Sequence, residues 1–187
     1  MAESVNLLTI IKELEEDAKF IEQEQLTELA DCILEAKRIF VAGAGRSGFV
    51  ARAFTNRLMH LGFTVYFVGE PTTPSIQKGD LLVIGSGSGE TKSLVSMAKV
   101  AHSKGTDIAT ITIFPENTIG TLSRIILKIP GVTAKSDNVS NKKESIQPLG
   151  SSFEQLTWLV YDSIIMELQE KTGQTNEQMF ERHANLE

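Results

Sequence analysis

Two short glycine-rich segments carry side-chain hydroxyls in a pattern that suits phosphate binding. Their sequences are G-A-G-R-S-G at residues 43–48 and G-S-G-S-G-E-T at residues 85–91. Each follows a short apolar run and precedes a helical pattern, so backbone N–H groups and a helix N-terminus can approach an anion. The hydroxyls add further donors. The candidate substrate-binding residues are Gly45, Arg46, Ser47, Ser86, Gly87, Ser88 and Thr91.

The first segment also matches the G-x-G-x-x-G fingerprint of dinucleotide-binding proteins. That fingerprint needs an acidic residue about 20 positions later, whereas Glu70 comes later than that and directly precedes Pro71. A dehydrogenase has no need of the second, serine-rich segment. If the two preceding strands are neighbours, four hydroxyls and two helix N-termini share one small volume, which favours a monophosphate over a dinucleotide.

Local helix capping is an alternative explanation for some of these residues. Ser88 or Glu90 can cap a helix that begins near residue 90, and Ser47 can cap the preceding helix. Capping and ligand binding are compatible. Arg46 also has two interpretations, because a guanidinium can pair with a phosphate or with a nearby carboxylate that fixes the loop.

Glu154 is the candidate general base. It follows Gly150, Ser151 and Ser152 in the first turn of an expected helix, and a carboxylate is a group that can remove and return a proton. The spacing from Ser151 to Glu154 also fits a capping box, in which the glutamate has only a structural role. The residue types alone do not separate these two interpretations.

His183 is the second candidate for catalysis. It lies in a polar C-terminal segment, where an isolated histidine ordinarily faces solvent, but an imidazole can also polarise a carbonyl or carry a proton between two oxygens. His60 and His102 fall within helical patterns, and we expect packing or surface positions for them. Cys32, the one cysteine, is expected to be a buried and unreactive thiol.

Composition excludes several classes of function. A net charge of −6 argues against nucleic acid as a partner. No apolar run approaches the roughly 18–20 residues of a membrane span, and the first residues lack the pattern of a signal peptide. A single cysteine among 187 residues is typical of the reducing cytoplasm. We therefore expect a cytoplasmic protein with no membrane and no nucleic-acid partner.

Alternating strand and helix patterns must position the candidate residues. Residues 1–37 show the spacing of one or two amphipathic helices. Five apolar, β-branched runs then indicate strands at 38–42, 64–68, 81–84, 107–113 and 125–129. Helical patterns lie between them at 46–61, 90–104 and 117–122. This alternation predicts an α/β fold, a doubly wound three-layer sandwich around a parallel sheet. Residues 131–150 are expected to form a long loop, residues 152–171 a helix, and residues 1–187 a single domain.

Four stretches of the chain resemble the sugar isomerase (SIS) family, and within it the 6-phospho-3-hexuloisomerase branch. They are residues 41–48, 69–75 with 79–82, 147–154, and the final R-H-A-N-L-E at 182–187. The likeness runs nearly from end to end. It implies a five-stranded parallel sheet in flavodoxin-like order with additional N-terminal helices.

The resemblance also implies a chemistry. Members of that branch interconvert 3-hexulose 6-phosphate and fructose 6-phosphate through an enediolate without a metal or cofactor, in formaldehyde fixation or pentose supply. By the same resemblance, Glu154 and His183 are catalytic, the chain forms a homo-oligomer, namely a tetramer, and residues 172–187 contribute to a site, which can belong to a neighbouring subunit. The alternatives are an SIS isomerase of another aldose or ketose phosphate, a sugar-phosphate sensor, and, more remotely, a dehydrogenase.

Overall fold

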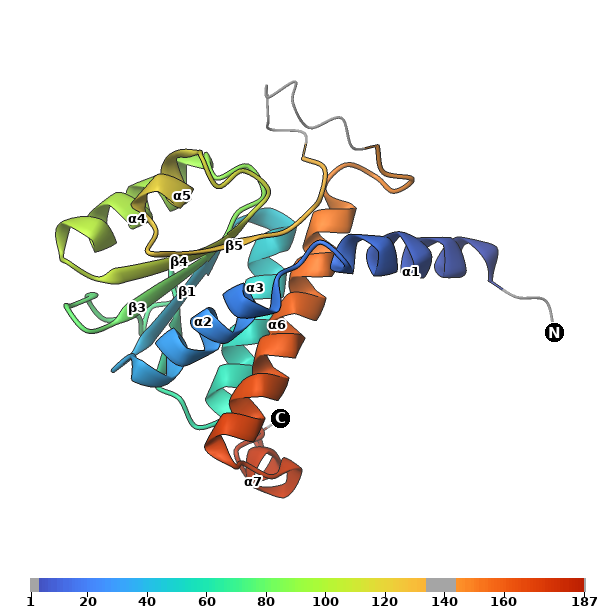
Figure 1. Ribbon diagram of the computed structural model, residues 1–187. Helices are drawn as coiled ribbons and strands as arrows, with labels where there is room; N and C mark the ends of the chain where they lie inside the picture. The colour runs from blue at the N-terminus through green and yellow to red at the C-terminus, as the bar shows by residue number, and fades with distance from the viewer. Residues whose placement is uncertain (1–3, 134–143, 187) are drawn as a thin grey trace.

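In the computed structural model, which describes residues 4–133 and 144–186, a five-stranded parallel sheet is covered by helices on both faces (Figure 1). The strand order is β2-β1-β3-β4-β5, the flavodoxin-like order, and the α/β fold class expected from the sequence is confirmed. The strands are β1 (Ile39–Gly43), β2 (Val65–Phe67), β3 (Leu81–Gly85), β4 (Asp107–Thr112) and β5 (Ile125–Lys128).

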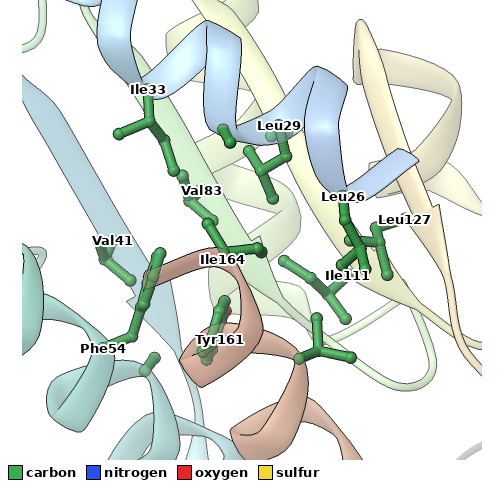
Figure 2. Close-up of a cluster of buried hydrophobic side chains, with 14 of the residues drawn as sticks. Leu26, Leu29, Ile33, Val41, Phe54, Val83, Ile111, Leu127, Tyr161 and Ile164 are labelled. Atoms are coloured by element: carbon green, nitrogen blue, oxygen red, sulfur yellow. The ribbon is translucent and has the colours of Figure 1, made fainter. Parts of the chain in front are cut away.

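Successive residues of each strand face opposite layers, and both layers are apolar. In β1, Ile39 and Val41 pack on the face covered by α2 (Gln23–Glu35), α3 (Gly45–His60) and α6 (Ser151–Thr172). Phe40 and Ala42 pack on the face covered by α4 (Lys92–Ser103) and α5 (Thr118–Leu122). Figure 2 shows side chains of α2, α3 and α6 meeting strand residues in the first of these layers. Burial on both faces explains the nearly continuous apolar runs of these strands.

The strand order brings the two glycine segments together. β1 and β3 are parallel neighbours, with Gly43 paired to Gly85 at the carboxyl ends of the two strands. The turn from β1 into α3 is tight, because a Cβ added to Gly48 would lie 2.9 Å from the carbonyl oxygen of Gly43. A shared phosphate site required these two strands to be adjacent, and they are.

An ion pair joins the opposite ends of the same two strands. Arg38, just before β1, donates from Nε and Nη2 to the carboxylate of Asp80, just before β3, at 2.9 and 2.5 Å. The backbone N–H of Gln77 donates to the same carboxylate at 2.7 Å. Burial alone would raise the pKa of Asp80, but the hydrogen bonds from Arg38 and Gln77 and the charge of Arg38 outweigh it, and the pKa is lowered.

The N-terminal residues form two helices with different roles. α2 packs on the sheet, whereas α1 (Val5–Ala18) projects from the body and contacts α6 (Figure 1). Val5, Leu7 and Ile11 of α1 are each at least half exposed. α1 therefore presents an apolar face that this chain covers only in part.

The C-terminal residues contain a helix that the sequence analysis did not predict, α7 (Asn176–Glu181). It begins with a capping box in which the Thr175 hydroxyl accepts from the backbone of Gln178 and the Gln178 side chain accepts from the backbone of Thr175. The sequence signal was present, since threonine and glutamine stand three residues apart.

The other predicted elements are confirmed within two residues at each end, and the described parts of the expected loop at 131–150 are irregular up to the start of α6. Residues 134–143 of that loop lie outside the described residues. No helix among the residues described is long and apolar enough to cross a membrane.

We expect Asp80→Asn to lower the free energy of unfolding at pH 7 by about 2 kcal/mol, because it leaves the Arg38 guanidinium without its buried anionic partner. Since the pKa of Asp80 is lowered in the folded state, this stabilisation is present above the unfolded pKa near 4 and is lost as pH falls through the folded value. Urea unfolding at pH 7 and at pH 3 measures both effects.

Asp107→Asn is the matched control, because its pair with Arg124 at 2.7 Å is about half exposed. We expect it to change the free energy of unfolding by less than about 1 kcal/mol. Equal losses for the two variants at pH 7 would contradict a special role for the Arg38–Asp80 pair.

Candidate active site

The hydroxyls of the two glycine segments surround the carboxyl ends of β1 and β3. Ser86 is buried, and its Oγ has no hydrogen-bond partner among the described residues. Ser88 is also buried, and its Oγ accepts from the backbone N–H of Glu90 at 3.3 Å. Ser47 lies in the first turn of α3, and Thr91 immediately precedes α4. A buried hydroxyl without a partner is unfavourable unless a ligand satisfies it, which makes Ser86 a strong candidate for an anion contact.

The capping interpretation of these residues is wrong. The N-cap residues of α3 and α4 are Ala44 and Thr91, and neither makes a side-chain cap hydrogen bond. The carboxylate of Glu90 instead accepts from the backbone N–H and the hydroxyl of Thr118, at 2.6 and 3.0 Å. Glu90 therefore ties the second segment to the start of α5, and the first turns of α3 and α4 keep their backbone donors free of side-chain caps.

The first half of α6 packs closely on the second glycine segment. A Cβ added to Gly87 would lie 3.3 Å from the ring of Phe153, and one added to Gly85 would lie 3.0 Å from the hydroxyl of Tyr161. The Tyr161 ring stacks on Phe54 of α3 at 4.1 Å between centroids, and its complete burial raises the pKa of the phenol. These contacts fix the start of α6 against the phosphate-binding candidates.

Glu154, in that first turn, pairs with Arg46 of the first glycine segment. The Arg46 Nε donates to Oε2 of Glu154, and the hydrogen bond and charge of the carboxylate raise the pKa of Arg46. The capping-box interpretation of Glu154 is therefore wrong as well. The N-cap of α6 is Gly150, at φ +91°, and it makes no side-chain cap hydrogen bond. Of the two interpretations of Arg46, the structure favours the carboxylate partner.

The two oxygens of Glu154 have different environments. Oε2 is held by Arg46, whereas Oε1 lies over Gly150, where an added Cβ would be 3.6 Å away, and accepts no hydrogen bond from any described residue. The Glu154 side chain is 14% exposed and that of Arg46 69% exposed. A carboxylate with one oxygen anchored and one available, beside the candidate phosphate-binding segments, has the geometry that a general base needs.

His183 does not join this group within one chain. Its ring stacks on His60 at 5.2 Å and on Phe180 at 5.9 Å between centroids. His60 is the last residue of α3, whereas Arg46 is in its first turn, so the two ends are separated by about 22 Å along the helix axis. Burial, followed by the charge of His183, lowers the pKa of His60.

Two adjoining hollows along α3 and α6 connect the surroundings of Glu154 with those of His183. Near Glu154 an apolar hollow of about 530 Å³ lies between α1, α3 and α6. Near His183 a polar hollow of about 270 Å³ is lined by Asn56, Arg57, His60 and Asp162. Val50 and Trp158 line both hollows. We call this surface the outer strip, and its apolar side chains include Phe49, 71% exposed, and Leu159, 51% exposed.

Sequence reasoning missed three features of these sites. The buried Oγ of Ser152 has no partner among the described residues, and the buried Tyr161 hydroxyl lies against Gly85. Arg182 anchors the C-terminal segment to His60. Arg182 was visible as part of the final six-residue match. Tyr161 lies at helical spacing from Ile164 and Leu168, which indicates a core position, whereas the burial of Ser152 has no local sequence signal. Among residues 4–133 and 144–186, no three His, Cys, Asp or Glu side chains are grouped as metal ligands.

Comparisons with known proteins agree with this architecture. The family model described as SIS domain matches residues 32–149. The chain belongs to the SIS domain family. It is 49% identical over 95% of both chains to a protein of Bacillus subtilis named 3-hexulose-6-phosphate isomerase. It is 40% identical to a protein of that name from Mycobacterium gastri, covering 97% of this chain and 90% of the other.

A solved structure matches this chain over nearly its whole length. It is a hypothetical protein of Methanococcus jannaschii for which a molecular function of 3-hexulose-6-phosphate isomerase was inferred. The TM-score is 0.82 at 34% identity, covering 97% of this chain and 98% of the other. The likeness therefore includes the helices outside residues 32–149.

We expect Ser86→Ala and Ser88→Ala each to weaken the binding of a sugar phosphate by about 1–3 kcal/mol, the loss of one charge-assisted hydrogen bond. Isothermal titration calorimetry measures the affinity. Ser103→Ala, at an exposed serine that ends α4, is the matched control and should bind as the unchanged protein does. Unchanged affinity in both loop variants would remove these hydroxyls from the site.

Proposed function

We propose that this chain interconverts 3-hexulose 6-phosphate and fructose 6-phosphate. The relatives' names support an isomerase that acts on a sugar phosphate. The observation that carries the proposal is the position of Glu154, whose Oε1 is available next to a glycine–serine edge with an unsatisfied buried hydroxyl. A base beside an anion-binding edge is what a phosphorylated ketose needs.

The reaction moves a carbonyl from C3 to C2 by proton transfer alone. Glu154 Oε1 removes the proton from C2, the C2–C3 enediolate forms, and the same oxygen returns the proton to C3. The hydroxyl proton of O2 passes to O3, so the substrate gains and loses no atoms. His183 serves this second transfer, either by carrying the proton or by polarising the carbonyl.

The phosphate fixes the sugar for this chemistry. It is attached to C6, at the far end of the molecule from C2 and C3, so the groups that bind it and the groups that move protons are separate. Ser47, Ser86, Ser88 and Thr91 bind the phosphate, with the first turns of α3 and α4 supplying backbone donors. Arg46 holds Glu154 in place from within the same segment.

Two copies of the chain complete the catalytic pair. Glu154 and His183 stand at opposite ends of the outer strip, which carries exposed apolar side chains of the kind that interfaces bury. A two-fold pairing of this strip with itself, the copies antiparallel, places Glu154 of one copy beside His183 of the other. The assembly is a homotetramer built from such pairs, acts in the cytoplasm, and serves formaldehyde fixation or pentose supply.

Replacing the base tests the proposed chemistry. We expect Glu154→Gln to lower kcat by on the order of a thousandfold or more while fructose 6-phosphate still binds, because the amide cannot accept the carbon-bound proton. A coupled assay from 3-hexulose 6-phosphate measures turnover. Glu24→Gln, at an exposed residue in the first turn of α2, is the control. Normal turnover by Glu154→Gln would exclude this residue as the base.

Mixed oligomers test where the histidine acts. Glu154→Gln and His183→Asn are each expected to be inactive alone. After the two are unfolded and refolded together in equal amounts, half of the pairs contain one copy of each, and one of the two sites in such a pair is intact. We therefore expect about a quarter of the wild-type activity to return. No recovery, in oligomers that native mass spectrometry shows to be mixed, would mean that both residues act within one chain.

A further inference from the structure

We infer that Arg182 is a positioning residue for His183, and that it fixes the C-terminal segment by binding the end of α3. The inference rests on the proposed function, in which His183 is catalytic. Arg182 itself touches none of the residues around Glu154, so its effect on the reaction passes through its neighbour.

Arg182 binds the one carbonyl that the end of α3 leaves open. The backbone N–H groups of Leu61, Gly62 and Phe63 take the carbonyls of Arg57, Met59 and Leu58, at 2.9–3.1 Å. The carbonyl of His60 instead accepts from Nη1 of Arg182 at 3.0 Å. The helix dipole favours a cation at a helix C-terminus, so the position of the guanidinium at the end of α3 is stabilised by charge as well as by the hydrogen bond.

The same Nη1 also holds the C-terminal segment together. It donates to the Gln174 side chain at 2.9 Å and to the Gln178 carbonyl at 3.1 Å. The guanidinium lies over Gly62, at φ +92°, where an added Cβ would be 3.4 Å from Cζ. One side chain thus connects the turn before α7, α7 itself and the end of α3.

His183 follows directly and is held by the same arrangement. Its N–H donates to the carbonyl of Phe180 at 2.9 Å, and its ring stacks against His60. His60 is buried and is the last residue of α3, so its backbone position is set by that helix. The His183 ring lines the polar hollow beside Arg57 and Asp162. With Arg182 removed, the ring stacks, the α7 turn and the 3.2 Å contact of His183 Nδ1 with the Ala184 carbonyl oxygen would remain, but Ala184 belongs to the same segment and cannot fix it to α3. The orientation of the ring toward a substrate would then be lost.

The division of roles in the proposed site predicts how the kinetics respond. In the proposed pairing the C-terminal segment of one copy lies beside Glu154 of the other, but the phosphate is bound by the two glycine segments, so loosening the C-terminal segment changes ground-state binding little. We expect Arg182→Ala to lower kcat about tenfold to a hundredfold, with KM changed less than about twofold. Guanidinium ion at millimolar concentration is expected to restore part of kcat in Arg182→Ala.

Arg182→Lys and Arg124→Ala are the companion variants. A lysine keeps the charge but cannot reach all three acceptors together, so we expect an intermediate kcat. Arg124 pairs with the exposed Asp107 at the sheet edge, and its removal should leave both kinetic constants unchanged. Hydrogen exchange of residues 174–186 is expected to quicken in Arg182→Ala, while urea unfolding and oligomer size match the wild-type protein.

The outcomes separate the inference from the proposed function. Normal kcat in Arg182→Ala, with His183→Asn inactive, would overturn the inference and leave the catalytic role of His183 intact. Full activity in His183→Asn would overturn that role, and the inference with it, whatever the exchange rates show. A low kcat that guanidinium ion restores in Arg182→Ala but not in His183→Asn would support both.

Discussion

The parallel pairing of β1 with β3 is the constraint on which the rest of the structure depends. With Gly43 opposite Gly85, both strands end at the same level, and both helices that follow begin there. The Arg38–Asp80 ion pair ties the other ends of these strands. Both faces of these strands are apolar, so the register is held by how the buried side chains of each layer fit against their neighbours and not by a difference in polarity between the faces. The phosphate-binding candidates therefore meet as a result of sheet packing, and no contact between the segments has to bring them together.

α3 determines how the remaining functional groups are distributed. Its first turn holds Arg46, which binds Glu154, and its last residue is His60, which supports His183. A helix is a stiff spacer of fixed length, so these two groups cannot approach each other within a chain. The same stiffness fixes the distance between the two ends of the outer strip. In the proposed pairing of two copies, the length of α3 then sets the distance between the two sites of a pair.

The sequence predicts features that depend on residues close together in the chain, but it does not predict hydrogen-bond partners that are far apart in the chain. The alternation of strands and helices and the two glycine segments predicted the fold and the edge where phosphate is proposed to bind. The capping interpretations of Glu90 and Glu154 failed because their carboxylates bind Thr118 and Arg46, 28 and 108 residues away. Such partners follow from the strand order, which local spacing does not encode. α7 is the opposite case, since its capping box is formed by residues three positions apart and is a local signal in the sequence.

The contact of Tyr161 with Gly85 has an evolutionary consequence. The hydroxyl occupies the space that any side chain at position 85 would need, with 3.0 Å to an added Cβ. A larger residue at 85 is compatible with the fold only if the residue at 161 becomes shorter, for example phenylalanine. Positions 85 and 161 should therefore vary together across the family. A substitution at the end of β3, at the proposed phosphate edge, then requires a matching substitution in the core.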